Sequence, residues 1–268
     1  ILTYADMNGV GPGTYNSFNA KLIKTLYKHS FDVLGQTTII DETEKRLKKE
    51  LTLKRNSEFQ KLSRTQQKKI LQIPSNLLFL RYNTKRILAV TKKAFETKTY
   101  KFAINNDKYL TIEIIRKDDF NLSYLLSKLS SLDVVNMDIC KLFDNLKYFK
   151  IDFSETVNTE EIGFIEEMIH DAFETTQSST LKIPDIEPNE IKIDCEHSKT
   201  YALMHLDCKD QKGLLAYVIY RFDQMGIDIA TAKIHTLKNR VKDMFLIEKN
   251  GNFCHNVDTI IDKLTGNK

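Results

Sequence analysis

The fold of this chain is indicated most clearly by the stretch Asp210-Gln211-Lys212-Gly213-Leu214-Leu215. It follows a partly alternating apolar run at 201–206, typical of a strand, and precedes a segment whose apolar residues recur on one helical face over 214–222. Gly213 stands at the junction, where a glycine lets the backbone approach a neighbour closely and leaves the first-turn N–H groups open to a carboxylate. The stretch predicts either a turn that binds a small carboxylate or an ordinary loop before a helix.

The same arrangement occurs earlier in the chain. Residues 117–125 align with residues 209–217, ninety-two positions later, and a strand-like run precedes each copy. After each copy we expect a helix, two strands and a second helix. The expected hairpins and final helices cover 134–153 and 160–173 in the first copy, and 228–248 and 255–264 in the second. A repeat of this length predicts two similar small α+β domains, because a solenoid would repeat every ~20–50 residues.

These features resemble the tandem ACT domains at the C-terminus of the PII uridylyltransferase/uridylyl-removing enzymes. In that family the turn usually reads Asp-Arg-Pro-Gly-Leu-Leu, and this chain keeps its first residue, Asp210, and its last three, 213–215. The strand at 228–234 and the approach at 191–194 are also similar to the family. The resemblance implies an α+β fold, with a helical N-terminal segment followed by two ferredoxin-like βαββαβ (ACT) domains.

A second resemblance lies at the start of the chain. Residues 2–18, continued by 21–27, are similar to the closing segment of the same family's HD hydrolase domain. This implies that Asp6 is a metal ligand in the full-length parent, together with upstream histidines and an aspartate. Because the chain begins at Ile1, directly on this motif, we expect it to be a piece of a longer protein.

The order of these features predicts four segments. We expect residues 1–34 to be the C-terminal end of an HD hydrolase domain and residues 35–97 to be a basic helical connector. Residues 98–178 are expected to form a first ACT domain with a degenerate loop, and residues 188–268 a second ACT domain. The first loop is called degenerate because Asn121 stands where the glycine would be, although asparagine tolerates a left-handed backbone better than most residues.

The resemblance implies an amino-acid site at the second loop, because ACT units pair their sheets and place one unit's loop beside the second strand of its neighbour. Asp210 would bind the ligand's α-amino group and the backbone near Gly213 and Leu214 its carboxylate, although Asp210 is also suited to cap the helix. The predicted binding residues are Asp210, Gln211, Lys212, Gly213, Leu214, Ile229, Ala230, Thr231 and Ala232. A weaker first-repeat site would comprise Asp118, Asn121 and Leu122.

The function implied by the resemblance is glutamine sensing that controls the nitrogen-dependent uridylylation of PII. The expected partners are a small amino acid, PII and the parent's own catalytic domains. The fragment would carry no catalytic residue and bind no cofactor. Its parent would be a nucleotidyltransferase that uses UTP with Mg²⁺ or Mn²⁺, and an HD phosphodiesterase that removes UMP. The alternative is a pair of ACT docking modules that act without a ligand.

Composition agrees with a multi-part chain that does not enter a membrane. Its 268 residues, 41% of them hydrophobic, suffice for about two domains, and no run of roughly eighteen apolar residues is present. The cysteines Cys140, Cys195, Cys208 and Cys254 lack paired spacing, and no secretion signal precedes them. We therefore expect reduced thiols and a cytoplasmic location.

Positive charge is concentrated between Asp41 and Lys93, where fifteen lysines and arginines stand against five acidic residues. Such a segment can bind nucleic acid, with Lys45, Arg46, Lys48 and Lys49 as its basic cluster. The segment has few aromatic residues and no nucleic-acid motif, so we do not expect nucleic acid as a partner. A solvated connector whose apolar residues, such as Leu47, Leu51 and Phe59, touch the body only lightly is the favoured interpretation.

Other constellations predict little chemistry. His170-Asp171 spells the dipeptide for which HD hydrolases are named, but it lies in a helical run without partner histidines. Cys195 and His197 lack the spacing of a strong zinc site. The glycines at 9–13 lack the lysine of a phosphate loop, and Pro12 removes an N–H donor.

Overall fold

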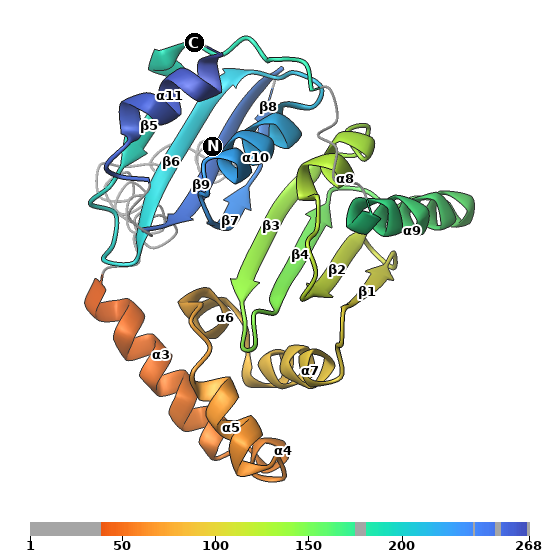
Figure 1. The fold of residues 1–268 in the computed structure, drawn as a ribbon, viewed down its shortest axis with the longest axis vertical. Coiled ribbons are helices and arrows are strands. Elements are labelled where there is room, and N and C mark those ends of the chain that lie inside the picture. The colour runs from red at the N-terminus through yellow and green to blue at the C-terminus, as the bar shows by residue number, and fades with distance from the viewer. Residues whose placement is uncertain (1–38, 175–180, 238, 250–252, 267–268) are drawn as a thin grey trace, which may run out of the picture.

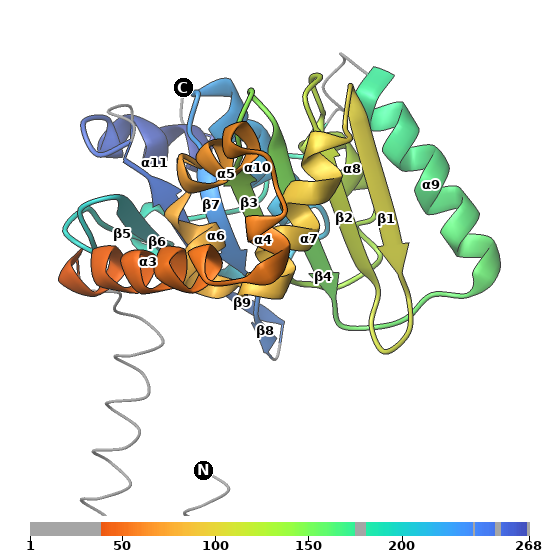
Figure 2. The same cartoon turned by 90° about the horizontal axis from the view of Figure 1, so that it is seen from below.

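The computed structural model describes residues 39–174, 181–237, 239–249 and 253–266. Within them, helices cover both faces of one nine-stranded antiparallel sheet, as Figure 1 and Figure 2 show. The strand order is β1-β2-β4-β3-β7-β9-β6-β5, and β8 pairs with β9. The protein is therefore of the α+β class, as the sequence predicts.

Five helices precede the sheet in the described part of the chain, and we call them the connector helices. They are α3 (Ile39–Lys54), α4 (Ser57–Gln60), α5 (Arg64–Leu71), α6 (Asn76–Arg81) and α7 (Thr84–Phe95). Polar residues begin the later ones. Ser63 forms a capping box with Gln66 at α5, and the Asn83 side chain accepts the Arg86 N–H at α7.

Two similar units follow. The first consists of β1 (Tyr100–Asn105), β2 (Thr111–Arg116), α8 (Leu122–Lys128), β3 (Val134–Lys141), β4 (Lys147–Phe153) and α9 (Thr159–Glu174). The second, after a short 3-10 helix at Pro188–Glu190, consists of β5 (Ile191–Asp194), β6 (Tyr201–Lys209), α10 (Leu214–Gln224), β7 (Ile229–Lys233), β8 (Thr236–Leu237), β9 (Arg240–Glu248) and α11 (Val257–Thr265).

Each unit contains the predicted strand, helix, two strands and helix, but its edge strand comes first. The order is ββαββα, whereas the βαββαβ pattern places the edge strand last. β1 pairs antiparallel with β2, and β5 with β6, so each fills the edge position beside the first strand of the motif. Strands joined by a short connection readily pair as neighbours, which explains why an added first strand can replace a last one.

The two units share the sheet through a short pairing of β3 with β7, which we call the seam. Asn136, Met137 and Asp138 lie opposite Lys233, Ala232 and Thr231. Lys141 adds ion pairs across the units, with its Nζ 2.8 Å from Asp228 and 2.6 Å from Glu248. Helices α8 and α10 pack against each other beside the seam. This is the sheet pairing that the resemblance implies.

Apolar side chains form a core on each face of the sheet. On one face Leu125 and Ile169, from α8 and α9, join Phe222 and Ile260, from α10 and α11, in a single cluster. On the other face the connector helices pack on the sheet through residues such as Phe79, and the strands contribute Cys140, Tyr148 and Tyr201. Figure 2 shows the connector helices on the near side of the strands.

The connector is a packed layer, so the prediction of light contact with the body is wrong for most of it. Leu47 and Leu51 are indeed about half exposed, but Leu53 and Phe59 are fully or almost fully buried. Arg46 joins α3 to other parts of this layer. Its guanidinium donates to the Leu71 and Ile73 carbonyls at 3.1 and 2.9 Å and lies 4.4 Å from the Phe79 ring centroid. A guanidinium used in this way is poorly available to nucleic acid.

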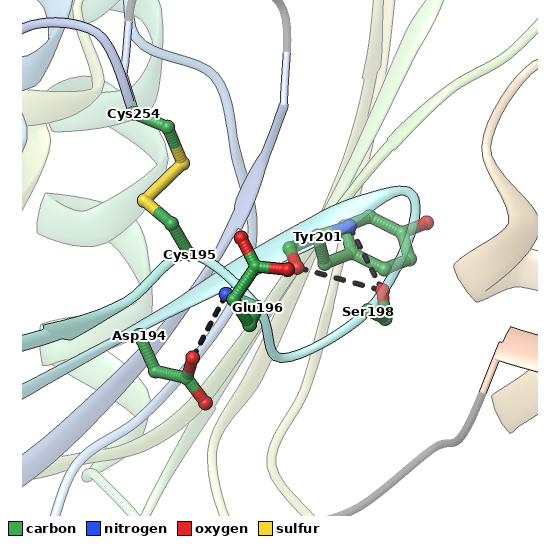
Figure 3. Close-up of a disulfide and its surroundings, with 6 residues drawn as sticks. All are labelled: Asp194, Cys195, Glu196, Ser198, Tyr201 and Cys254. Carbon is green, nitrogen blue, oxygen red and sulfur yellow. Dashed lines mark hydrogen bonds between the residues drawn. A yellow bond between two sulfur atoms is a disulfide. The ribbon is translucent and has the colours of Figure 1, made fainter.

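Cys195 and Cys254 form a disulfide, which corrects the expectation of four reduced thiols. Their Cα atoms are 5.9 Å apart, within the ordinary range for a disulfide, and fifty-nine positions separate them. Figure 3 shows the bond, which joins the end of β5 to the segment before α11. Sequence spacing could not reveal this pair because the fold alone brings the two segments together. Cys140 and Cys208 are buried free thiols.

The β5–β6 turn beside the disulfide is fixed by its own polar contacts. The Asp194 carboxylate accepts the Glu196 N–H at 2.8 Å, and the Ser198 hydroxyl accepts the Tyr201 N–H at 2.9 Å, as Figure 3 shows.

Among the described residues, no helix is long and apolar enough to cross a membrane.

Candidate functional site

A cavity of about 300 Å³ lies between the Asp210 loop and the neighbouring unit. We call it the Gly213 cavity. One side is formed by residues 210–216 and the other by Leu126 and residues 129–134, which run from the end of α8 into β3. The loop of the second unit therefore faces the start of its neighbour's second motif strand, as expected for paired ACT units.

Gly213 shapes the floor of this cavity. Its φ of +82° lies in the left-handed region, which glycine adopts readily, and a Cβ atom added there would meet nothing within 4 Å. The missing side chain leaves the beginning of α10 uncovered. Leu214 and Tyr217 donate their N–H groups to the carbonyls of Gln211 and Gly213.

The two intervening N–H groups, of Leu215 and Ala216, have no hydrogen-bond partner within the described ranges. Both residues line the cavity. Free N–H groups at a helix N-terminus attract anions, because the helix dipole adds to their own partial charges. The cavity therefore offers two donors to a carboxylate.

Two carboxyl groups, which can bind a cationic group of a ligand, also line the cavity. Asp210 is exposed, and its backbone N–H donates to the Asn239 carbonyl at 2.9 Å. Asp243, on β9, is only 2% exposed and accepts the His235 N–H at 3.2 Å. Burial raises the pKa of Asp243 to about 7, against the effect of the His235 hydrogen bond, and the charge of Asp210 raises it further.

Sequence reasoning missed Asp243. The available signal was an acid at an inward position of a strand, because Val241, Phe245 and Ile247 on the same face of β9 are buried. A buried carboxyl between such residues is costly unless it is protonated or meets a cation. Asp243 is therefore a candidate ligand group.

The other predicted loop residues have separate roles. The Gln211 side chain is occupied, because its amide donates to the Asp185 carbonyl at 2.9 Å and accepts the Asp185 N–H at 2.8 Å. Lys212 is exposed at the cavity, and Leu214 lines it while its side chain packs in the core.

The predicted strand residues Ile229, Ala230, Thr231 and Ala232 do not line the Gly213 cavity. Ile229 lines the cavity of the first repeat, and Thr231 donates to Asp138 at 2.8 Å on the connector face. A β-bulge between Ile229 and Thr231 changes which residues share a face, and the neighbouring unit fills the place assigned to them.

The first repeat has a smaller cavity, of about 80 Å³, lined by Asn121 and Leu122 together with residues of the second unit. Asn121 has a φ of −84° and is not left-handed. Its side-chain oxygen accepts the Tyr124 N–H at 2.9 Å. Asp118 does not line this cavity, and its carbonyl accepts a hydrogen bond from Arg116 at 2.8 Å.

The two units differ at the first turn of the helix that follows each loop. Asn121 corresponds to Gly213, and Tyr124 corresponds to Ala216. In the first unit a side-chain oxygen occupies the N–H that the second unit leaves free. The first loop is thus capped by its own side chain, and the second is open.

No cluster of three potential metal ligands occurs in the described part of the chain. Asp6 lies outside the described residues. His170 contacts the Tyr100 hydroxyl through Nδ1 at 2.8 Å, so it has a structural partner. Cys195, which lacks strong zinc-site spacing with His197, forms the disulfide with Cys254.

No family model matches the chain. Among solved structures, a protein described as a glycine cleavage system transcriptional repressor aligns with 57% of this chain and 86% of its own, at 12% identity and a TM-score of 0.20. At this TM-score the two structures superpose poorly.

Curated relatives are more informative. Proteins from Psychrobacter cryohalolentis, Bradyrhizobium sp. and Rhodospirillum rubrum are 26%, 24% and 21% identical to it, and each alignment covers 92% of this chain. The chain spans only 31%, 29% and 29% of their respective lengths. Over nearly its whole length, then, this chain is similar to the C-terminal part of the bifunctional uridylyltransferase/uridylyl-removing enzymes.

Proposed function

We propose that this chain is the amino-acid-sensing regulatory region of a uridylyltransferase/uridylyl-removing enzyme, and that its effector is glutamine. The observation that carries the proposal is the open Gly213 cavity, whose lining residues include two with free N–H donors and two with carboxyl groups. An α-amino acid presents the complementary pair of charges. We infer the class of enzyme from the names of the similar proteins, and the class of ligand from the chemistry of the cavity.

The bound amino acid would span the cavity. Its carboxylate would accept hydrogen bonds from the Leu215 and Ala216 N–H groups, and its ammonium group would lie toward Asp210 and Asp243. A cation beside Asp243 favours the ionised carboxylate, so binding near neutral pH would release a proton from that group. Proton release on binding is therefore a signature of this site.

Regulation would follow from the position of the cavity between two units. A ligand that contacts both units stabilises the arrangement in which the cavity is formed, and allosteric coupling of this kind is typically about 1–3 kcal/mol. The partners would be PII and the parent's own catalytic domains, which would use UTP with Mg²⁺ or Mn²⁺. Glutamine would thus report nitrogen supply to the enzyme that modifies PII.

The test is a calorimetric titration with glutamine, with glutamate, asparagine and leucine as comparison ligands. The key variant is Gly213→Asn, which places an amide side chain in the open space at the start of α10. Asparagine tolerates the left-handed backbone, and the space beside Gly213 is open. We expect saturable binding selective for glutamine, and its loss in this variant.

Gly163→Asn is the matched control, because Gly163 is exposed on α9 and has open space around its Cα. It should bind glutamine as the unaltered chain does. Binding that survives Gly213→Asn would contradict the proposed site, and the absence of binding by any of the four amino acids would contradict the sensing function.

One observation favours the docking alternative for the first unit alone. Because Asn121 caps its own helix, the first loop offers no free donor at Tyr124. This unit would then act as a platform for the second one, to which the seam joins it.

A further inference from the structure

A separate cavity of about 220 Å³ lies on the opposite face of the sheet, under the connector helices. We call it the connector cavity. Its walls come from α3 and α6 on one side and from β6, β7 and β9 on the other. It lies close to the seam, because Thr231 lines it and pairs with Asp138 across the units.

Most of its wall is apolar. Leu77 and Leu80 come from α6, and Leu203, Met244 and Leu246 from the strands. All except Leu77 are only partly buried, and all five residues line the cavity. A ligand with an apolar body would bury this surface, which is favourable at about 25 cal/mol per Å².

One charge in the wall is unbalanced. Lys233 is partly buried, and no hydrogen bond or ion pair reaches its ammonium group from the residues that the structure describes. The nearby carboxylate of Asp138 is already engaged, because Arg81, Tyr82 and Thr231 all donate to it. Burial lowers the pKa of Lys233 and the charge of Arg81 lowers it further, while the charge of Asp138 acts in the opposite direction.

The remaining polar groups leave this imbalance in place. Glu42 is buried in the wall but is engaged with a partner of its own, and Lys45 is a further cation, exposed on α3. Burial lowers the pKa of His197, which favours its neutral form. A partly buried ammonium group without a counter-ion in hydrogen-bond range favours an anionic ligand.

We propose that the connector cavity binds a small amphipathic carboxylate, with its carboxylate at Lys233 and its short apolar chain against Leu80, Leu203 and Leu246. One unpaired ammonium group suits one negative charge. Such a ligand would bridge the connector helices and the second unit, and so would strengthen the docking of α3 and α6 on the sheet. The site is independent of the Gly213 cavity, which lies on the other face.

Hexanoate is the probe, with hexanamide and hexylammonium as neutral and cationic analogues of the same chain length. Binding is followed by NMR on the whole chain, through amide shifts at Lys233 and Leu246. We expect saturable shifts with hexanoate, at least about tenfold weaker binding of hexanamide, and none of hexylammonium.

Lys233→Gln should weaken hexanoate binding by about tenfold or more, while Lys192→Gln, an exposed strand position outside this cavity, should leave it unchanged. Leu203→Trp keeps Lys233 and fills the space, so it should abolish binding. Thermal melts establish that each variant is folded. The Gly213→Asn variant should bind hexanoate normally, which separates this site from the proposed sensor.

Several results would overturn the proposal. They are the absence of saturable shifts with hexanoate, equal binding of hexanoate and hexanamide, and unaltered affinity in a folded Lys233→Gln or Leu203→Trp variant. Glutamine binding without hexanoate binding would leave the sensing function standing and remove only this second site.

Discussion

The two loops differ in one side chain at the start of their helices. Asn121 accepts the Tyr124 N–H at 2.9 Å, so its replacement by alanine removes a helix N-cap. We expect Asn121→Ala to lower the free energy of unfolding by about 1 kcal/mol, as measured by urea denaturation. Glutamine affinity should not change, because the open site belongs to the other unit.

Asn83→Ala is the matched control, because Asn83 caps α7 by accepting the Arg86 N–H at 2.8 Å. The two variants should lose similar stability. A fall in glutamine affinity in Asn121→Ala alone would show that the first loop takes part in binding.

Asp243 should make stability depend on pH. Its pKa rises from 3.8 in the unfolded chain to about 7 in the folded one. Between these values the folded state holds a proton that the unfolded state has lost, so stability falls as the pH rises from about 4 to about 7. Asp243→Asn cannot ionise and should be more stable than the unaltered chain by up to about 4 kcal/mol at about pH 8.

Urea denaturation at about pH 5 and about pH 8 tests this expectation. Asp207→Asn is the control, because that carboxylate is about half exposed beside Arg240. If Asp243→Asn and the unaltered chain lose stability in parallel between the two pH values, Asp243 does not carry the effect.

The packing of helix α3 against the other connector helices depends on Arg46. Its guanidinium joins α3 to the Leu71 and Ile73 carbonyls, and it donates to Asn76 at 2.5 Å. We expect Arg46→Ala to lower the free energy of unfolding by about 2 kcal/mol, because the carbonyls lose a charged donor in a partly buried place. Lys48→Ala removes an exposed pair with Glu44 and should change it by less than about 0.5 kcal/mol.

Chemical denaturation of both variants provides the measurement. Equal losses would mean that Arg46 is only a solvated surface charge. Salt-sensitive binding of RNA that disappears in Arg46→Ala, without loss of stability, would instead support the nucleic-acid alternative.

Local patterns predicted the repeated elements well, because alternating and helical apolar spacings are properties of neighbouring residues. The turn at Gly213 and the acidic residue Asp210 were likewise visible as a motif. The rest depended on distant segments. The face of the sheet on which residues 229–232 lie depends on the bulge in β7. The far wall of the Gly213 cavity comes from Leu126 and residues 129–134 of the other unit.

Asp243, the packed connector and the disulfide were missed for the same reason. The buried state of Asp243 depends on the elements around β9, and Leu53 is buried only in the cluster that the later connector helices form with α3. Cys195 and Cys254 meet after fifty-nine positions of chain have folded. Contacts of this range are not encoded in any short spacing.

For the chain as one folded unit, the disulfide closes a long loop around most of the second unit. A cross-link of this length stabilises by up to about 4 kcal/mol, because it restricts the unfolded chain. We expect Cys254→Ser to lose about 2–4 kcal/mol under oxidising conditions, as measured by urea denaturation.

Dithiothreitol supplies the control within the same experiment. It should lower the stability of the unaltered chain to that of Cys254→Ser and leave the variant unchanged. A chain whose stability is insensitive to the reductant would contradict a disulfide between Cys195 and Cys254.

The contrast between one open and one self-capped loop sets the shape of the dose–response curve. On the proposed function, a monomeric chain has one binding site for its effector and a Hill coefficient of about 1. Occupancy then rises from one tenth to nine tenths only over about an 80-fold increase in effector concentration. The response of such a receptor changes gradually with effector concentration. On the same proposal, any sharper threshold would have to arise after effector binding, in the enzyme that this region would regulate.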